Sequence, residues 1–220
     1  PKPDDDLKYN EGALVGEWVK FPTTAEELQK VFERIGIGSK DDFGHPYEEW
    51  FITDYDCSDA TIGKVLGEYE SLSELNYLAG QIMELRESDD FWQAVLDLGE
   101  NTGSVQELIN LTENLDCFDY LPGVRNDYDL GYYWIEESGC YDTSNLGALA
   151  NYIDYESFGR DIRYEEGGMF GDNGYVRSNG GRFVDIYDGD IESIPEEYRI
   201  NSPVVMERTE VKRQTEQPER

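Results

Sequence analysis

The chain has 220 residues with 49 acidic and 18 basic side chains, and its formal net charge of −31 repels nucleic acid and anionic membranes and favours a cationic partner. Hydrophobic residues make up 38% and aromatic residues 13%, which is enough to bury cores and excludes an acidic disordered chain. The three cysteines are far apart and no signal peptide or long apolar run is present, so we expect a soluble cytoplasmic protein with reduced thiols.

The first part of the chain predicts a small α+β domain over residues 1–70. An apolar stretch at 13–21 predicts a strand, and a second strand is expected at 49–56. Between them, Thr24 begins a capping box, in which its hydroxyl accepts the N–H of the third helical residue. The helix that follows has one apolar stripe, and Gly36 is placed to end it. Because the chain begins without a methionine, we allow for missing residues ahead of it.

The central part predicts a bundle of short helices over residues 71–118. Ser71 and Ser104 each begin a capping box with a glutamate three residues later. Ser88 can cap a third helix, which Gly99 would end. Helices this short are marginal alone, so we expect them to pack against one another.

The C-terminal part returns to mixed structure and predicts an α+β domain over residues 119–190. An aromatic run at 130–136 predicts a strand, and an apolar stripe within 144–158 predicts a helix. Two apolar runs around a glycine-rich turn predict an antiparallel hairpin over residues 175–187. Hydrophobicity then fades, so residues 191–220 are expected to form a polar, mobile tail. The predicted fold class is α+β, as an elongated chain of three small domains.

Acidic side chains dominate residues 65–159. This segment holds 20 carboxylates and two basic side chains, a net charge of 2 − 20 = −18, and its acids lie mostly off the apolar stripes. A solvated helix surface usually accounts for such a run, but ordinary surfaces intersperse both signs. We therefore interpret the segment as a fixed negative surface that takes the place of DNA phosphates. The carboxylates expected to bind the partner are Glu68, Glu70, Glu74, Glu84, Glu87, Asp89, Asp90, Asp97, Glu100, Asp116 and Asp119.

The amount of charge is compatible with this interpretation. Duplex DNA carries one charge per ~1.7 Å, so 31 net charges match roughly 53 Å of duplex, or about 15 base pairs. A compact globule of 220 residues would have a diameter of roughly 44 Å. Three small domains in series would spread the charge along a rod, and a two-fold dimer would double its length.

Enzymatic chemistry finds little support in the sequence. His45 is the only histidine and has no evident partner, and the cysteines lack the spacing of a zinc site. The acidic run around Gly189 has the composition of a calcium loop but the wrong register, because Val184 stands where the first ligand would be. Carboxylate pairs are uninformative among 49 acids. We expect no catalytic residue, no metal and no cofactor.

Four blocks of the sequence resemble a known family. They are KYNEGALVGEWVKFP (8–22), EEWFITDYD (48–56), LSELNYLAGQI (72–82) and NYIDYESFGRDI (151–162). In this order they are similar to the ArdA family of antirestriction proteins, and the similarity runs to about residue 187. The chain departs from the family in its first residues, where PKPDDDL replaces an apolar strand, and in the additional residues after 190.

The resemblance implies an elongated three-domain protein that mimics bent B-form DNA and is carried by conjugative plasmids and transposons. Such a protein occupies the DNA-binding site of type I restriction–modification enzymes and has no catalytic activity. The resemblance also implies a homodimer formed through the C-terminal domain, with the interface candidates Tyr132, Tyr133, Trp134, Leu146, Leu149 and Tyr152. A buried core role for the aromatic residues at 132–134 is an equal alternative.

The acidic composition also fits two unrelated kinds of protein. An ordinary protein adapted to high salt would be acidic on all faces, although the concentration of charge in residues 65–159 argues against this. A calcium-binding or carbohydrate-active protein with an unrelated activity is the second alternative.

Overall fold

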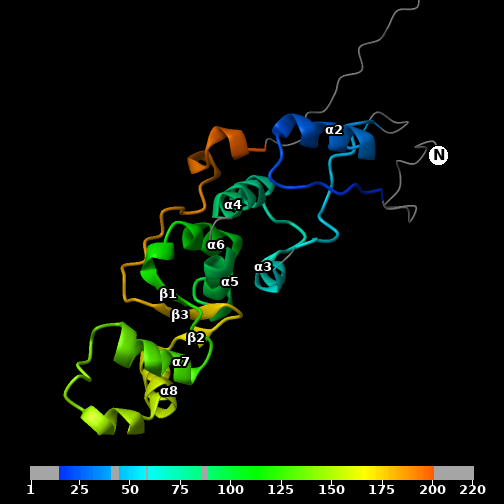
Figure 1. The fold of residues 1–220 in the computed structure, drawn as a ribbon. Helices are drawn as coiled ribbons and strands as arrows, with labels where there is room; N and C mark the ends of the chain where they lie inside the picture. The colour runs from blue at the N-terminus through cyan, green and yellow to red at the C-terminus, as the bar shows by residue number, and fades with distance from the viewer. Residues whose placement is uncertain (1–14, 41–44, 58, 86–88, 201–220) are drawn as a thin grey trace, which may run out of the picture.

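The computed structural model describes residues 15–40, 45–57, 59–85 and 89–200. These residues form an elongated molecule whose elements follow one another along a long axis (Figure 1). Helix α2 (Ala25–Ile35) lies at one end and helices α7 (Asp127–Tyr132) and α8 (Tyr155–Glu166) lie at the other. Further helices and a small antiparallel sheet lie between them, which confirms the α+β class.

Helix α2 begins and ends where the sequence predicts. The Thr24 hydroxyl accepts the backbone N–H of Glu27 at 3.2 Å, and Gly36 ends the helix in the left-handed conformation with φ of 91°. The apolar stripe is buried, and Phe32 packs against Trp50 with ring centroids 5.5 Å apart.

The two strands predicted on either side of α2 were wrong for the residues that the structure describes. Residues 15–21 and 49–56 are irregular, and residues 13–14 lie outside the description. The backbone of Thr23 pairs with the side chain of Asn76 on a central helix, with N···O distances of 2.7 and 3.0 Å, and not with a strand. An apolar run predicts burial, but it does not reveal whether a partner strand exists.

The centre of the molecule contains the helices α3 (Ala60–Val65), α4 (Leu72–Glu84), α5 (Asp89–Leu98) and α6 (Val105–Thr112). The predicted caps of α4 and α6 are confirmed, since Ser71 and Ser104 accept backbone N–H groups at 3.4 and 3.1 Å. The predicted cap Ser88 lies outside the described residues. Helix α3 was not predicted, because its six residues are too few for an apolar pattern.

The sheet separates two hydrophobic cores. A 3-10 turn (Leu115–Cys117) leads into β1 (Phe118–Pro122), which pairs with β3 (Gly174–Ser178), and β3 pairs in turn with β2 (Met169–Phe170). Successive side chains of a strand point to opposite faces. Val176 of β3 therefore enters the larger core, with the central helices, whereas Tyr175 enters a smaller core beside α7.

The hairpin predicted over residues 175–187 was wrong. Strand β3 pairs with β1 and β2, and residues 182–187 form no strand. Val184 and Tyr187 bond instead to side chains in and just after α6. The Asn114 side chain bonds to both the N–H and the C=O of Val184, and Asn110 bonds in the same way to Tyr187, at 2.8–2.9 Å. An asparagine amide has the donor and the acceptor of a peptide group, so these two side chains supply what a neighbouring strand would supply.

The C-terminal elements also differ from the prediction. Residues 130–136, predicted as a strand, belong to α7 and to the π-helical turn that continues it (Tyr133–Glu137). The helix predicted at 144–158 is a 3-10 helix (Gly147–Tyr152) followed by α8. The aromatic run suited a strand, but Asn126 caps α7 by accepting a backbone N–H at 2.9 Å, and this local signal outweighs the pattern.

Helices α7 and α8 cross at two glycines. A Cβ atom on Gly131 would lie 1.9 Å from the carbonyl oxygen of Tyr155, and one on Gly159 would lie 1.8 Å from that of Asp127. No larger side chain fits at either position, so both glycines are needed for the close approach of the two helices.

Residues 179–200, which we call the strap, run back along the central helices toward α2 (Figure 1). The strap contains two 3-10 helices, Ile191–Ser193 and Glu196–Tyr198. Ile194 is fully buried in the larger core, and the Tyr198 ring covers Gly80 of α4. Residues 191–200, predicted as the start of a polar tail, are therefore held on the central helices by a few well-spaced apolar side chains. The rest of that tail lies outside the described residues.

We expect Asn110→Ala to lower the free energy of unfolding by about 2–4 kcal/mol. The substitution removes both hydrogen bonds between Asn110 and the backbone of Tyr187. The buried N–H of Tyr187 is left without a partner, while the Tyr187 carbonyl still accepts a hydrogen bond from the Gln106 amide at 3.2 Å. Urea denaturation followed by circular dichroism measures the change. Asn145→Ala, at an exposed position, is the control and should cost less than about 0.5 kcal/mol. Equal values for the two variants would contradict the role given to Asn110.

We expect Gly159→Ala to destabilise the protein by about 3 kcal/mol, because the new methyl group meets the carbonyl of Asp127 and separates α7 from α8. Gly63→Ala is the matched control, since Gly63 also lies in a helix but its Cβ would meet no neighbouring atom within 4 Å. Alanine favours helix, so this control should raise stability by up to about 1 kcal/mol. Thermal melting compares the two variants, and equal midpoints would argue against a close helix crossing.

Candidate partner-binding surface

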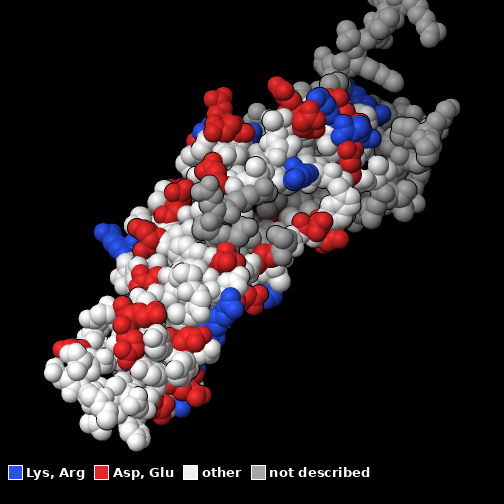
Figure 2. Space-filling model, viewed as in Figure 1, with Lys and Arg blue, Asp and Glu red and all other residues white. Residues whose placement is uncertain are grey.

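Most of the predicted carboxylates in and around the central helices point into solvent. Figure 2 shows acidic side chains along the whole length of the visible face, while the largest group of lysine and arginine side chains lies at the end with α2. Glu87 lies outside the described residues, as does the side chain of Asp89. The exposed members of the predicted set are Glu68, Glu84, Asp90, Asp97, Glu100 and Asp116.

Burial of the apolar stripes fixes the direction of these acids, as α5 illustrates. Trp92, Val95 and Leu96 are buried in the larger core. Asp90 and Asp97 are two helical turns apart on the side that faces solvent. A charge held in place by a packed helix loses little further conformational entropy when a partner binds, so the surface is preorganised.

Glu70 and Glu74 have structural partners. Glu70 accepts the backbone N–H of Gly67 at 3.1 Å, and Glu74 accepts the Tyr187 hydroxyl of the strap at 2.7 Å. Burial raises the pKa of Tyr187 and the adjacent Glu74 raises it further, so the hydroxyl remains a donor. Burial, together with the charge of Glu70, raises the pKa of Tyr55 to about 12. These two carboxylates therefore stabilise the fold as well as adding charge.

Asp119 belongs to a charged cluster on the sheet. Its carboxylate accepts a hydrogen bond from the Arg177 guanidinium at 2.9 Å across the β1–β3 pair, and Arg177 also bonds to Glu166 on α8. Burial raises the pKa of Glu166, although the charge of Arg177 opposes this change. Within the described part of the chain, Asp119–Arg177 is the one ion pair that includes a predicted carboxylate.

The strap adds acids that the sequence did not connect with the central helices. Asp185 and Asp188 are exposed, and they are next in the chain to Val184 and Tyr187, which bond to side chains in and just after α6. Val184 is 70 positions from its partner Asn114, and Tyr187 is 77 positions from its partner Asn110. No local sequence pattern therefore indicates that the charges of the strap share a surface with those of the central helices.

The acids around Gly189 form turns. The Asp188 carboxylate accepts the N–H of Asp190, and the Asp190 carboxylate accepts the N–H of Glu192, both at 3.0 Å. No group of three or more His, Cys, Asp or Glu side chains among the described residues could hold a metal ion. The helices of the same residues include none with the length and apolarity to cross a membrane.

The residues predicted for a dimer interface fall into two groups. Tyr132, Leu146, Leu149 and Tyr152 are exposed at the α7–α8 end of the molecule, and Leu149 and Tyr152 are 67% and 83% exposed. Tyr133 and Trp134 are partly buried and pack against the smaller core. The alternative of a core role therefore applies to the second group and not to Tyr132.

A family model described as antirestriction protein (ArdA) matches residues 7–177. No curated protein matches the chain. The matched range includes all of the helices from α2 to α8 and nearly all of β3, and it ends just before the strap.

We expect stability to fall at alkaline pH, in part through Tyr55, whose hydroxyl donates to the Gly67 carbonyl at 2.6 Å. Folding raises its pKa from 10.0 to about 12, so the unfolded chain releases this proton first as the pH rises. The contribution of Tyr55 is therefore complete below about pH 10 and lost by about pH 12. Urea midpoints measured from about pH 8 to 11.5 should decline less in Tyr55→Phe than in the wild type. The exposed Tyr69→Phe should decline as the wild type does, and the same decline in Tyr55→Phe would contradict the assignment.

Proposed function

The chain belongs to the ArdA family of antirestriction proteins, and from this membership we propose that it is a non-catalytic mimic of DNA. In this proposal it occupies the DNA-binding site of type I restriction–modification enzymes, so that incoming DNA is left uncut. The observation that carries the mechanism is the exposure of six carboxylates on and beside the central helices: Glu68, Glu84, Asp90, Asp97, Glu100 and Asp116.

The binding energy would come from the same source as that of DNA binding. A protein that grips DNA presents lysine and arginine side chains to the phosphates, and association releases the counterions condensed around them. Fixed carboxylates on a chain of net charge −31 can replace the phosphates in this exchange. Affinity should therefore fall steeply with salt, as it does for DNA itself.

We propose that the chain consists of three domains, at residues 1–70, 71–118 and 119–190. In support, α2 buries its own apolar stripe against Trp50, and the sheet divides the remaining interior into two cores. Charges spread along such a series repel one another less than charges on a sphere.

We further propose that two copies associate through the exposed apolar residues at the α7–α8 end. Leu146, Leu149 and Tyr152 lie in and beside the 3-10 helix there and cover no core of their own chain. A two-fold dimer would extend the acidic surface along a duplex-like length. The protein would act in the cytoplasm, carried by a mobile element such as a conjugative transposon whose entering DNA it protects.

The proposal is tested by neutralising the six exposed carboxylates together, as Asn or Gln. Inhibition of DNA cleavage by a purified type I enzyme should weaken by about 100-fold or more, and the salt dependence of competition with DNA should become shallower. Single neutralisations should matter little, because the charge is distributed.

The matched control neutralises six exposed carboxylates elsewhere: Glu26, Glu33, Asp56, Glu165, Glu196 and Glu197. It changes the net charge equally and should retain most of the inhibition. The proposal would fail if the first variant still competed fully with DNA. Equal losses in both variants would show that net charge, and not this surface, decides binding.

A further inference from the structure

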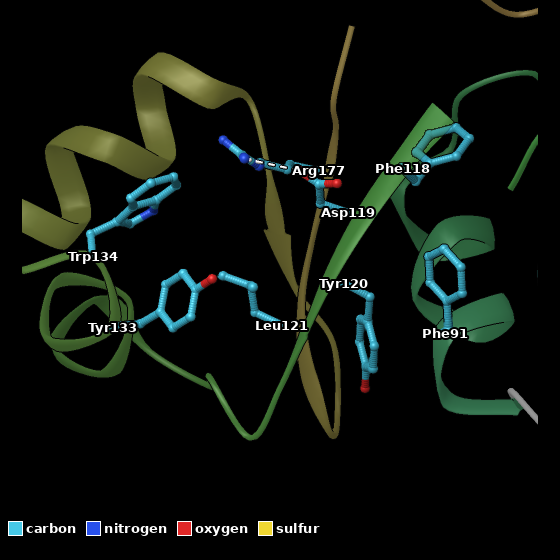
Figure 3. Close-up of a pocket in the computed structure, with 8 residues that line it drawn as sticks. All are labelled: Phe91, Phe118, Asp119, Tyr120, Leu121, Tyr133, Trp134 and Arg177. Carbon is cyan, nitrogen blue, oxygen red and sulfur yellow. Dashed lines mark hydrogen bonds and ion pairs between the residues drawn. The ribbon is translucent and has the colours of Figure 1, made fainter. Parts of the chain in front are cut away.

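A cavity of about 470 Å³ lies beside strand β1, between α5 and the π-helical turn (Figure 3). Phe91 and Tyr120 form one wall, stacked with ring centroids 5.6 Å apart. Tyr133 and Trp134 form the opposite wall, edge to face at 5.7 Å. The volume is in the range of small-ligand sites, which are typically lined by aromatic rings with a few polar groups. π-helical turns are frequent at functional sites, and this one supplies two of the four rings.

The polar side of the cavity is formed by the Asp119–Arg177 pair. Arg177 already donates from both terminal nitrogens, to Glu166 and Asp119, while its Nε atom and the Nε1 atom of Trp134 are buried without a hydrogen-bond partner. Its guanidinium also stacks on Trp134, with 5.1 Å to the ring centroid. With one guanidinium between two carboxylates, the local net charge is −1.

Asp119 keeps capacity to accept further hydrogen bonds. Its side chain is 41% exposed, and it receives one bond from Arg177 at 2.9 Å and one from the Asn179 amide at 3.3 Å. An ionised carboxylate has about four acceptor positions, so about two remain. A ligand in the cavity therefore meets aromatic faces and a partly free carboxylate, and both of these groups attract a cation.

We propose that this cavity binds a planar cation, a guanidinium or amidinium group, which stacks on the aromatic walls and donates to the Asp119 carboxylate. The carboxylate and a guanidinium match in geometry, because both are planar and can form two parallel hydrogen bonds. Such a group could belong to a free small molecule or to an arginine of the restriction enzyme. An arginine of the restriction enzyme as the ligand rests on the proposed function, whereas cation binding by the cavity does not.

Titration of the ¹⁵N-labelled protein with benzamidine tests the cavity, with the indole N–H signal of Trp134 as the readout and Trp134→Phe to identify that signal. Benzamidine should shift the signal saturably. Benzoate, which has the same ring and the opposite charge, should leave it unchanged. Equal shifts with both compounds, or no shift with benzamidine, would overturn the proposal.

Asp119→Asn should bind benzamidine at least about tenfold more weakly, because a charge-assisted hydrogen bond is lost. Asp56→Asn, which removes an exposed carboxylate that does not line the cavity, should bind it as the wild type does. Tyr133→Leu keeps the charge and removes a wall, and it should weaken binding as well. Unchanged affinity in both Asp119→Asn and Tyr133→Leu would overturn the proposal.

The restriction assay then separates the two sources of the cation. If Asp119→Asn inhibits cleavage about tenfold less than Asp56→Asn does, the cavity receives an arginine of the enzyme. If the two variants inhibit equally, its ligand is a free small cation. Failure of the wild type to inhibit cleavage would refute the proposed function, and the benzamidine titration would still decide the cavity.

Discussion

Three buried asparagine side chains hold distant parts of the chain to the central helices. Asn76 of α4 bonds to the backbone of Thr23 and to the carbonyl of Tyr198, while Asn110 and Asn114 at the end of α6 bond to the strap. Each amide satisfies peptide groups that a sheet would otherwise pair, so these segments can be buried without becoming strands. The arrangement suits a protein that must expose many charges, because it makes an ordered surface from few apolar residues.

The sequence predicted the elements whose signals are local. The capping residues Thr24, Ser71 and Ser104 lie within three residues of the N–H groups that they accept, and all three helix starts are confirmed. Strand β1 was missed because its partner β3 lies more than 50 residues away, and the aromatic run at 130–136 was misread because its rings are shared between two sides of α7 and its π-helical turn. The partner of β1 is a residue that no local pattern identifies. The run at 130–136 did have a local signal, the Asn126 cap, which the aromatic pattern obscured.

The partners of the acidic side chains on the candidate surface were also only partly predictable from local sequence patterns. That most of the acids face solvent follows from the apolar stripes, since a packed helix leaves its polar side outside. That Glu74 holds a strap hydroxyl and Asp119 holds a guanidinium could not be predicted, because Tyr187 and Arg177 lie 113 and 58 residues further along. Acidic residues of the same type in one segment therefore have different roles, and the role of each depends on its neighbours in the folded structure.

The strap has a consequence for the order in which the protein can form. Ile194 fills the larger core, and Tyr198 and Ile200 close on α4 through contacts that span 122 and 127 residues. During synthesis the central helices leave the ribosome first and remain with one side uncovered until these late residues follow. Closing such long loops is slow, and half-covered apolar surfaces are prone to aggregate. During the same interval the negative charge of the central segment opposes aggregation, because strongly negative nascent chains repel one another.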